Sequence, residues 1–314
     1  MKWKQWTALF LSLIMTVTIT GCGEIRVVKL NEDGEVETGE GETGAAGGTG
    51  VDGEAGVLEN VSELQPSEYA TEIVDRPDEE YAEISNALES WWFKRNEEHL
   101  PSGCQDNFDI SPYHAYYINQ DATDNVIYLT FDCGYENGYT ARILDTLKEQ
   151  NVKAVFFVTQ HFIASEPELV KRMKEEGHFV GNHTNHHPSL PSLSIEKQRE
   201  EIASCAAYMK EATGYDMDPY IRPPKGEYSE RTLQLCEDMG YCTVFWSMAY
   251  LDYEVNNQPS PDYVVNHFIK YCHPGAVPLL HNVSSANAEA LPKVIEGLRE
   301  AGYRFGTIDE FCHF

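Results

Sequence analysis

The chain has 314 residues and carries 51 acidic against 23 basic side chains, which gives a formal net charge of −28. This length allows one large domain with appended segments, and such a domain can bury a core without help from disulfides. The acidic balance excludes nucleic-acid binding as the main function, because no strongly basic segment is present to meet phosphates.

The first 21 residues have the pattern of an export signal. Lys2 and Lys4 precede an apolar run over residues 9–17, which is short for a bilayer-spanning helix. The run leads into Ile19-Thr20-Gly21-Cys22, which resembles a bacterial lipobox. That resemblance implies that Cys22 becomes the mature N-terminus and carries lipid, anchoring the protein to the outer side of the cell membrane. The alternative is an uncleaved membrane anchor with an incidental cysteine.

Most of the negative charge follows this signal. Between Gly23 and Ser90 there are 19 acidic and 3 basic residues, and residues 31–59 are almost all Glu, Asp, Gly, Thr and Ala. Such a segment has too little apolar mass to form a core and repels itself into an extended chain. We therefore predict an acidic linker at 22–85 and a catalytic domain at 86–314, with an aromatic-rich N-terminal extension at 86–124.

From residue 125 onward, strand-like and helix-like segments alternate. This alternation predicts a parallel sheet covered by helices, and about seven similar units favour closure into a distorted (β/α) barrel of the α/β class. The absence of a G-x-G-x-x-G after the first strand argues against a dinucleotide-binding fold. Strands are predicted at 126–131, 153–159, 179–180, 220–221, 242–248, 276–280 and 303–305, and helices at 139–149, 167–176, 195–212, 229–239, 261–271 and 287–301.

Polar side chains suited to catalysis fall directly after several of these strands. In parallel α/β folds the active site lies at the carboxyl ends of the strands, so we expect these side chains to meet. They are Asp132 after the first strand, His183 and His187 after the third, Arg222 after the fourth, Asp252 after the fifth and His281 after the sixth.

The histidine pair indicates a metal site. His183 and His187 are four residues apart, so on a helical turn both imidazoles would share one face and bind one ion. An open catalytic site needs a third protein ligand, for which Asp132 and Cys133 are the nearest candidates. His186 would point elsewhere. A surface loop is the alternative explanation of the pair.

In order along the chain, five motifs resemble those of the NodB-type polysaccharide deacetylases, carbohydrate esterase family 4. The resemblance extends over about residues 86–314. Longer runs after Phe131, Arg222 and His281 are similar to the branch that deacetylates muramic acid on the way to muramic δ-lactam in the spore cortex. The five motifs are Thr130-Phe131-Asp132, His183-Thr-x-x-x-His187-Pro188, Arg222-Pro-Pro-Lys-Gly226, Asp252 and Leu279-Leu280-His281.

The resemblance implies a role for each matching residue. Asp132 would be the general base that activates water, with Arg222 orienting it and lowering its pKa. His281 would be the general acid, with Asp252 raising its pKa and fixing its tautomer. The other implied groups are the metal ligands His183 and His187, the Lys225 backbone N–H as oxyanion donor, and the substrate-binding residues Tyr253, Pro224 and Leu279.

Three positions depart from the family pattern. Cys133 stands where the family has a metal-binding aspartate; a thiolate would favour softer ions, whereas a buried neutral thiol would leave only two histidines. Ala249 replaces the first aspartate of a D-x-x-D-W element, and Tyr253 replaces its tryptophan but still offers an aromatic wall.

The predicted cofactor is a divalent metal ion. Zinc is the first choice, and manganese, cobalt and magnesium are alternatives.

The leading functional hypothesis is a monomeric, lipid-anchored N-deacetylase of N-acetylmuramic acid in peptidoglycan. Its alternatives are a deacetylase of N-acetylglucosamine in peptidoglycan or another glycan, and a non-catalytic glycan-binding lipoprotein. An intact base, acid and arginine argue against the last. Structural alternatives also stand: Asp132 as a helix cap, Arg222 in a structural ion pair, and Asp252 with His281 in a structural hydrogen bond.

The chain has eight cysteines and no C-x-x-C pair, so a zinc ribbon is not expected. Export permits disulfides, but spacing does not assign them. We predict that Cys205, Cys236 and Cys242 are buried thiols, because they lie in apolar helix or strand patterns.

Overall fold

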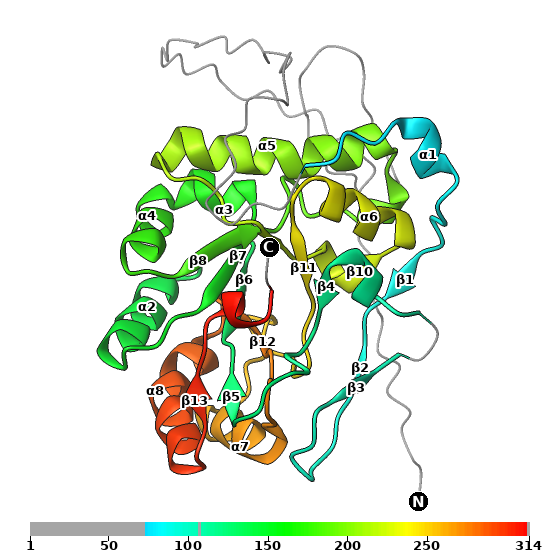
Figure 1. Ribbon diagram of the computed structural model, residues 1–314. Coiled ribbons are helices and arrows are strands. Elements are labelled where there is room, and N and C mark those ends of the chain that lie inside the picture. Colours follow the sequence, from blue (N-terminus) through cyan, green and yellow to red (C-terminus); the bar gives the residue numbers. More distant parts are fainter. Residues whose placement is uncertain (1–72, 106–107, 313–314) are drawn as a thin grey trace, which may run out of the picture. The chain divides into compact units, whose positions relative to one another are not determined.

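The computed structural model describes residues 73–105 and 108–312 (Figure 1). The predictions for the export signal, the lipid on Cys22 and the acidic linker up to residue 72 lie outside these ranges. Among the described residues, none belongs to a helix with the length and apolar character that a membrane crossing requires.

A seven-stranded parallel sheet lies at the centre of the fold (Figure 1). The sheet curls, because Ile118 beyond one edge strand forms an isolated bridge with Ala276 just before the other edge strand. This arrangement confirms the predicted distorted barrel. The strand order is β12 (Leu279–His281), β6 (Thr130–Cys133), β7 (Val155–Val158), β8 (Phe179–Asn182), β9 (Tyr220–Ile221), β11 (Cys242–Val244) and β4 (Ala115–Tyr116).

Helices cover the outside of this sheet (Figure 1). Four of them begin at a serine whose hydroxyl accepts a backbone N–H of the first turn, which is why these helices start where they do. These serines are Ser194, Ser229, Ser260 and Ser284. The helices are α2 (Thr140–Glu149), α3 (Gln160–Ser165), α4 (Pro167–Glu175), α5 (Ile195–Thr213), α6 (Glu230–Asp238), α7 (Pro261–Tyr271) and α8 (Ser285–Glu300).

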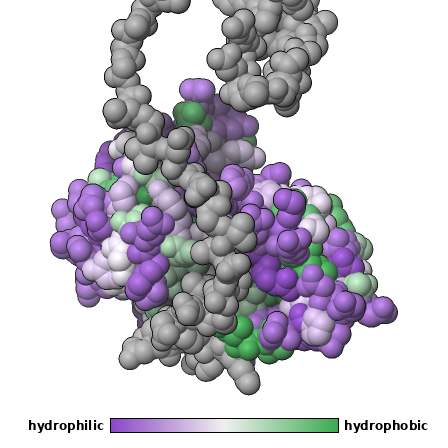
Figure 2. Space-filling model, turned by 90° about the horizontal axis from the view of Figure 1, so that it is seen from above, coloured by the Kyte–Doolittle hydropathy of each residue, from purple (hydrophilic) through white to green (hydrophobic). Residues whose placement is uncertain are grey.

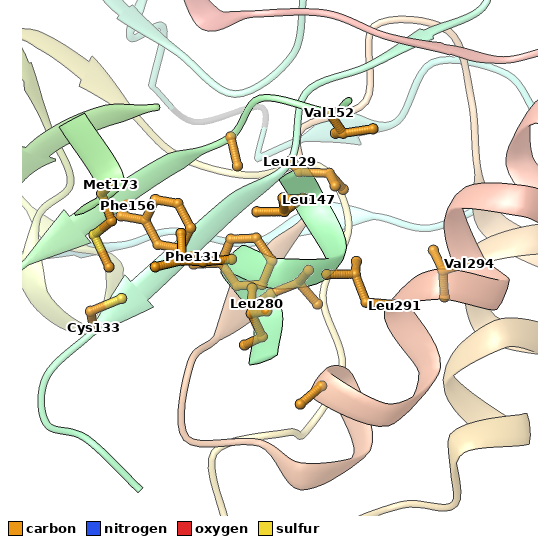
Figure 3. Close-up of a cluster of buried hydrophobic side chains, with 14 of the residues drawn as sticks. Leu129, Phe131, Cys133, Leu147, Val152, Phe156, Met173, Leu280, Leu291 and Val294 are labelled. Carbon is orange, nitrogen blue, oxygen red and sulfur yellow. The ribbon is translucent and has the colours of Figure 1, made fainter. Parts of the chain in front are cut away.

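The largest apolar cluster fills the space between the sheet and these helices. In Figure 3, Phe131 and Phe156 from adjacent strands pack with Leu147 of α2 and Leu291 of α8. Alternate residues of β6 therefore face this core, and Asp132 between Phe131 and Cys133 faces the other side of the sheet. The face shown in Figure 2 is mostly hydrophilic, with hydrophobic residues only in small patches.

Two predicted strands differ from the observed ones. The run 126–131 is divided into β5 (Val126–Ile127) and the start of β6, and the predicted seventh strand is β13 (Arg304–Phe305). β13 pairs in parallel with β5 in a separate two-stranded sheet, so it is not the seventh strand of the barrel. β4 takes that place; it has only two residues and gives no period that sequence reasoning could detect.

The N-terminal extension packs on the barrel. β1 (Glu89–Ser90) pairs with β10 (Glu227–Tyr228), β2 (Phe93–Lys94) pairs with β3 (Gly103–Cys104), and Trp91 stacks on Phe245 with ring centroids 4.5 Å apart. Single 3-10 turns complete the fold at η2 (Ser111–Tyr113), η3 (Leu190–Ser192), η4 (Pro224–Gly226) and η5 (Ile308–Glu310).

The domain begins earlier than the predicted residue 86. α1 (Asp78–Ala82) carries Tyr81, which is 1% exposed, and its hydroxyl donates to Asp238 of α6 at 2.7 Å. Arg76 donates to the same carboxylate at 2.6 Å, and the Val74 N–H donates to the Asp238 carbonyl at 2.8 Å. Residues 73–85 therefore belong to the folded unit, and their assignment to the linker is wrong. The acidic composition of this segment suggested a linker, and the one buried tyrosine that attaches it to the domain gave no signal in the sequence.

One cysteine prediction is also corrected. Cys242 of β11 forms a disulfide with Cys312 near the C-terminus, 70 residues away, so it is not a free thiol. Cys205 and Cys236 are free and buried, as predicted.

We expect Tyr81→Phe to lower the free energy of unfolding by about 1.5 to 3 kcal/mol, because the buried Asp238 carboxylate loses a charged hydrogen bond. Urea denaturation followed by tryptophan fluorescence measures this. The matched control is Tyr263→Phe, which removes a hydroxyl from a tyrosine that is 47% exposed. Equal midpoints for both variants would contradict an anchoring role for residues 73–85.

Candidate active site

A pocket of about 570 Å³ lies at the carboxyl ends of the central strands. Its walls include Asp132, His183, His187 and His281, which come from β6, the loop after β8, and β12. The structure thus brings together side chains that are far apart in the sequence, as their positions after the strands predict. Asp132 and His281, for example, are 149 residues apart. Arg222 and Asp252 lie behind this wall and are both 0% exposed.

Arg222 holds the base candidate. Its Nη1–H donates to Asp132 Oδ1 at 2.7 Å, and its other N–H groups donate to Thr130 Oγ1 at 2.9 Å, to the Val244 carbonyl at 2.9 Å and to the Phe245 carbonyl at 3.1 Å. Burial raises the pKa of Asp132, but attraction to the Arg222 guanidinium outweighs burial and holds that pKa below its usual value. Asp132 is therefore an ionised carboxylate that exposes its second oxygen to the pocket.

His183 is held as a neutral imidazole. The His183 Nδ1 lies 2.8 Å from the Arg222 carbonyl, and a carbonyl can only accept, so Nδ1 carries the proton and donates it. In the neutral ring, Nε2 then carries the lone pair. Burial lowers the pKa of His183 despite the nearby Asp132 carboxylate. The Nε2 lone pair and Asp132 Oδ2 face each other at 3.5 Å. Two acceptors in this position favour a cation or a donor between them.

His187 lies next to His183, with ring centroids 4.8 Å apart. Burial and the neighbouring His183 lower the pKa of His187 to about 4, so it is also neutral at physiological pH. The two residues do not share a helical turn, which corrects the predicted geometry. They follow β8 in a loop with left-handed backbone at Thr184 (φ 67°) and His187 (φ 58°), and the His187 N–H donates to the Thr184 hydroxyl.

The donor chemistry of this corner fits a divalent metal ion, because two neutral imidazoles lie beside an ionised carboxylate. Among the described residues, however, no three His, Cys, Asp or Glu side chains are arranged so that they could hold an ion together. His183 and His187 are the two neutral imidazoles that line this corner.

Cys133 is not part of this corner, and its prediction as a metal ligand is wrong. The side chain is 0% exposed and belongs to the apolar cluster with Phe131, Phe156 and Met173 (Figure 3). Burial, with the charge of Asp132, raises the pKa of the Cys133 thiol well above its usual value. It is a neutral core thiol on the opposite face of β6 from Asp132, because adjacent strand residues point to opposite sides.

The acid candidate is paired with a buried carboxylate. His281 Nδ1–H donates to Asp252 Oδ1 at 2.7 Å, and the His281 backbone N–H donates to Asp252 Oδ2 at 2.8 Å. Burial lowers the pKa of His281, but the charge and hydrogen bond of Asp252 outweigh it, so this pKa lies above its usual value. The Tyr253 ring, 55% exposed, lies 5.4 Å from the His281 ring and forms a pocket wall.

The remaining predicted residues surround the pocket without all lining it. In the described part of the chain, the pocket is lined by Tyr253 but not by Pro224, Leu279 or Lys225. Lys225 has left-handed backbone (φ 62°) within η4, which sets the direction of its peptide group. The next residue must be glycine, since a Cβ at Gly226 would come within 2.7 Å of the Trp246 ring.

His161 and Asn282 are among the pocket residues that sequence reasoning missed. His161 lies in α3, a six-residue helix that was not predicted, although the segment directly follows β7 as the other site residues follow their strands. Asn282, adjacent to His281, is 0% exposed and donates to the Tyr135 carbonyl and the Thr140 hydroxyl, both at 2.9 Å. It holds the loop after β6 against the loop after β12, a contact without a local sequence signal.

The chain is similar to several known proteins. A family model described as polysaccharide deacetylase matches residues 119–244. The chain is 44% identical over 229 residues to the peptidoglycan-N-acetylmuramic acid deacetylase PdaA of Bacillus subtilis, covering 72% of this chain and 87% of that protein. It is 31% identical over 237 residues to a peptidoglycan-N-acetylglucosamine deacetylase of Bacillus cereus, covering 73% and 84%. The solved structure of Bacillus subtilis PdaA, a family 4 carbohydrate esterase, superimposes with a TM-score of 0.70 at 43% identity, covering 73% of this chain and 98% of that one.

We expect Cys133→Ala to leave the amount of bound metal unchanged and to lower the free energy of unfolding by about 1 kcal/mol, because only a core contact is lost. Elemental analysis after dialysis against zinc, with His187→Ala as the comparison, measures the first quantity. A loss of zinc in Cys133→Ala as large as that in His187→Ala would return the thiol to the metal site.

Proposed function

Because the chain belongs to the polysaccharide deacetylase family, we propose that it hydrolyses N-acetyl groups of peptidoglycan, acting on N-acetylmuramic acid residues. The observation that carries the proposal is the placement of two charged pairs at one pocket. Asp132 with Arg222 supplies an ionised base, and His281 with Asp252 supplies a protonated acid. Amide hydrolysis needs both, since water is a weak nucleophile and an amine a poor leaving group.

On the base side, the free oxygen of Asp132 would accept a proton from water as that water attacks the acetamide carbon. Arg222 keeps the carboxylate charged and fixes its direction through the 2.7 Å hydrogen bond, so the second oxygen remains toward the pocket. The Lys225 backbone N–H, in the left-handed turn of η4, would donate to the developing oxyanion.

On the acid side, His281 would deliver a proton from Nε2 to the leaving nitrogen. Asp252 binds the opposite ring nitrogen, so the tautomer and the direction of the imidazole are fixed before the substrate arrives. Release of the amine and acetate then returns the pocket to its starting protonation after proton exchange with water.

His183 and His187 would hold a divalent metal ion, which when bound supplies polarisation of the acetamide carbonyl. We propose zinc, because neutral imidazoles are among its usual ligands; manganese, cobalt and magnesium are alternatives. The neutral state of both histidines supports this assignment.

The preference for muramic acid over glucosamine rests on the relatives. The chain shares 44% identity with an N-acetylmuramic acid deacetylase and 31% with an N-acetylglucosamine deacetylase. Tyr253 would form the wall against which the sugar ring lies, and Pro224 and Leu279 are the other predicted substrate-binding residues. A peptidoglycan substrate implies a site outside the cell membrane, and lipid on Cys22 would hold the monomer there. The spore-cortex role stays a prediction.

The direct test is incubation of residues 73–314 with zinc and glycan strands stripped of stem peptides, followed by mass spectrometry of the fragments. We expect loss of one acetyl group from muramic acid residues, and Asp132→Asn to reduce that loss by about 100-fold while keeping the fold. Loss from glucosamine alone would replace the proposed substrate with the alternative. Glycan binding without any loss, with each metal supplied, would favour a binding protein.

We expect Asp252→Asn to lower kcat by about 100-fold and to move the basic limb of the kcat profile to lower pH. Asp252 raises the pKa of His281 against the effect of burial, so without its charge the imidazole loses its proton at lower pH. Initial rates of acetate release across the pH range measure this, with Asp216→Asn, from an exposed ion pair with Lys210, as control. A basic limb that stays in place would remove His281 as the acid.

A further inference from the structure

We propose that Asn287 is a positioning residue for the general acid, and that the Tyr250 hydroxyl helps to hold its amide in place. The inference rests on the proposed function, because it concerns the carboxylate that supports His281. It extends the pair Asp252–His281 into a chain of four side chains, Tyr250–Asn287–Asp252–His281.

The contacts of Asp252 show what Asn287 does. Asp252 Oδ1 accepts the His281 Nδ1–H at 2.7 Å, whereas Oδ2 accepts the His281 backbone N–H at 2.8 Å and the Asn287 Nδ2–H at 2.7 Å. The Asn287 amide also donates to the His281 carbonyl at 3.2 Å. Asp252 is 0% and Asn287 is 3% exposed, so water does not compete for these bonds. Two donors on one oxygen prevent the carboxylate from rotating away from the imidazole.

Tyr250 holds the oxygen end of the Asn287 amide. The Asp252 carboxylate and the His281 carbonyl can only accept, so the amide nitrogen points to them. On the other side, the Tyr250 hydroxyl donates to Asn287 Oδ1. Burial, with the nearby Asp252 charge, raises the pKa of Tyr250, and the hydroxyl therefore keeps its proton. A flipped amide would place its oxygen against two acceptors, the Asp252 carboxylate and the His281 carbonyl.

The fold holds Asn287 rigidly. It lies in the first turn of α8, where Ser284 accepts its backbone N–H at 3.1 Å, so its side chain is not needed for capping. The Ser284 hydroxyl donates to Gln258 Oε1, and Gln258 Nε2 donates to the Asp252 carbonyl at 2.6 Å. The start of α8 therefore holds both the backbone and the side chain of Asp252. Asn287 does not line the pocket, so a substrate there would not touch it.

The test uses three variants and one control on residues 73–314. Asn287→Leu has a similar volume without the donor, Asn287→Asp replaces the donor by a group that donates only when protonated, and Tyr250→Phe removes the hydroxyl that helps to hold the amide. The control Tyr263→Phe removes an exposed hydroxyl from the ring packed against Tyr250, with centroids 5.9 Å apart. Thermal unfolding of each variant shows which of them keep the fold.

We expect Asn287→Leu to lower kcat by about 10- to 100-fold with little change in KM, since a misplaced acid slows chemistry without weakening binding. The kcat of Tyr250→Phe should fall by a smaller factor, and the kcat of Tyr263→Phe should equal that of the parent. Asn287→Asp should recover toward the parent kcat as the pH falls, because its carboxyl group then regains a proton to donate to Asp252.

An unchanged kcat in folded Asn287→Leu would overturn the proposal. So would an Asn287→Asp variant that shows no recovery at low pH, that is, whose kcat relative to the parent stays the same at every pH and no higher than that of Asn287→Leu. A rise in KM equal to the fall in kcat/KM would also overturn it, by assigning Asn287 to substrate binding. These outcomes require an active parent. An inactive parent contradicts the proposed function instead, so the two failures are distinguishable.

Discussion

The buried guanidinium of Arg222 is the group on which the site depends. It is 0% exposed and donates to Asp132 and Thr130 on β6 and to two carbonyls at the end of β11, while its own carbonyl accepts from His183. A buried charge is costly unless its donors are used, and here the contact with Asp132 also orients the base candidate. The Arg222 side chain therefore ties three strand ends together and fixes the base candidate, and the Arg222 backbone carbonyl fixes the His183 ring.

The same principle, a buried partner for each reacting group, gives the pocket two opposite protonation states. Arg222 keeps Asp132 ionised, and Asp252 keeps His281 protonated above its usual range. Without these partners, burial alone would act in the reverse sense on both groups, neutralising the carboxylate and the imidazole. An acid and a base that coexist near neutral pH in one pocket are what amide hydrolysis needs at its two ends.

Sequence reasoning found the site because its residues follow strands, and parallel strands end at the same side. It failed where tertiary packing decides. Cys133 is adjacent to Asp132 in sequence, but strand alternation sends it into the core with Phe131. The His183–His187 spacing suggested a helical turn, whereas Asn182 and Thr184 side chains fix a loop through hydrogen bonds to backbone N–H groups. The role of Tyr81 was not predicted, because a single buried side chain in an acidic segment creates no hydrophobic periodicity.

The spacing between His281 and Asn287 also has a structural reason. β12 ends at His281, Ser284 caps α8, and the first helical turn brings the residue at 287 back over Asp252. A shift of one residue along the helix would rotate the amide by about 100° and break its bond to the carboxylate. The acid side of the pocket thus depends on where α8 begins, as the base side depends on Arg222. The serine cap that starts the helix therefore also determines where the Asn287 amide meets the Asp252 carboxylate.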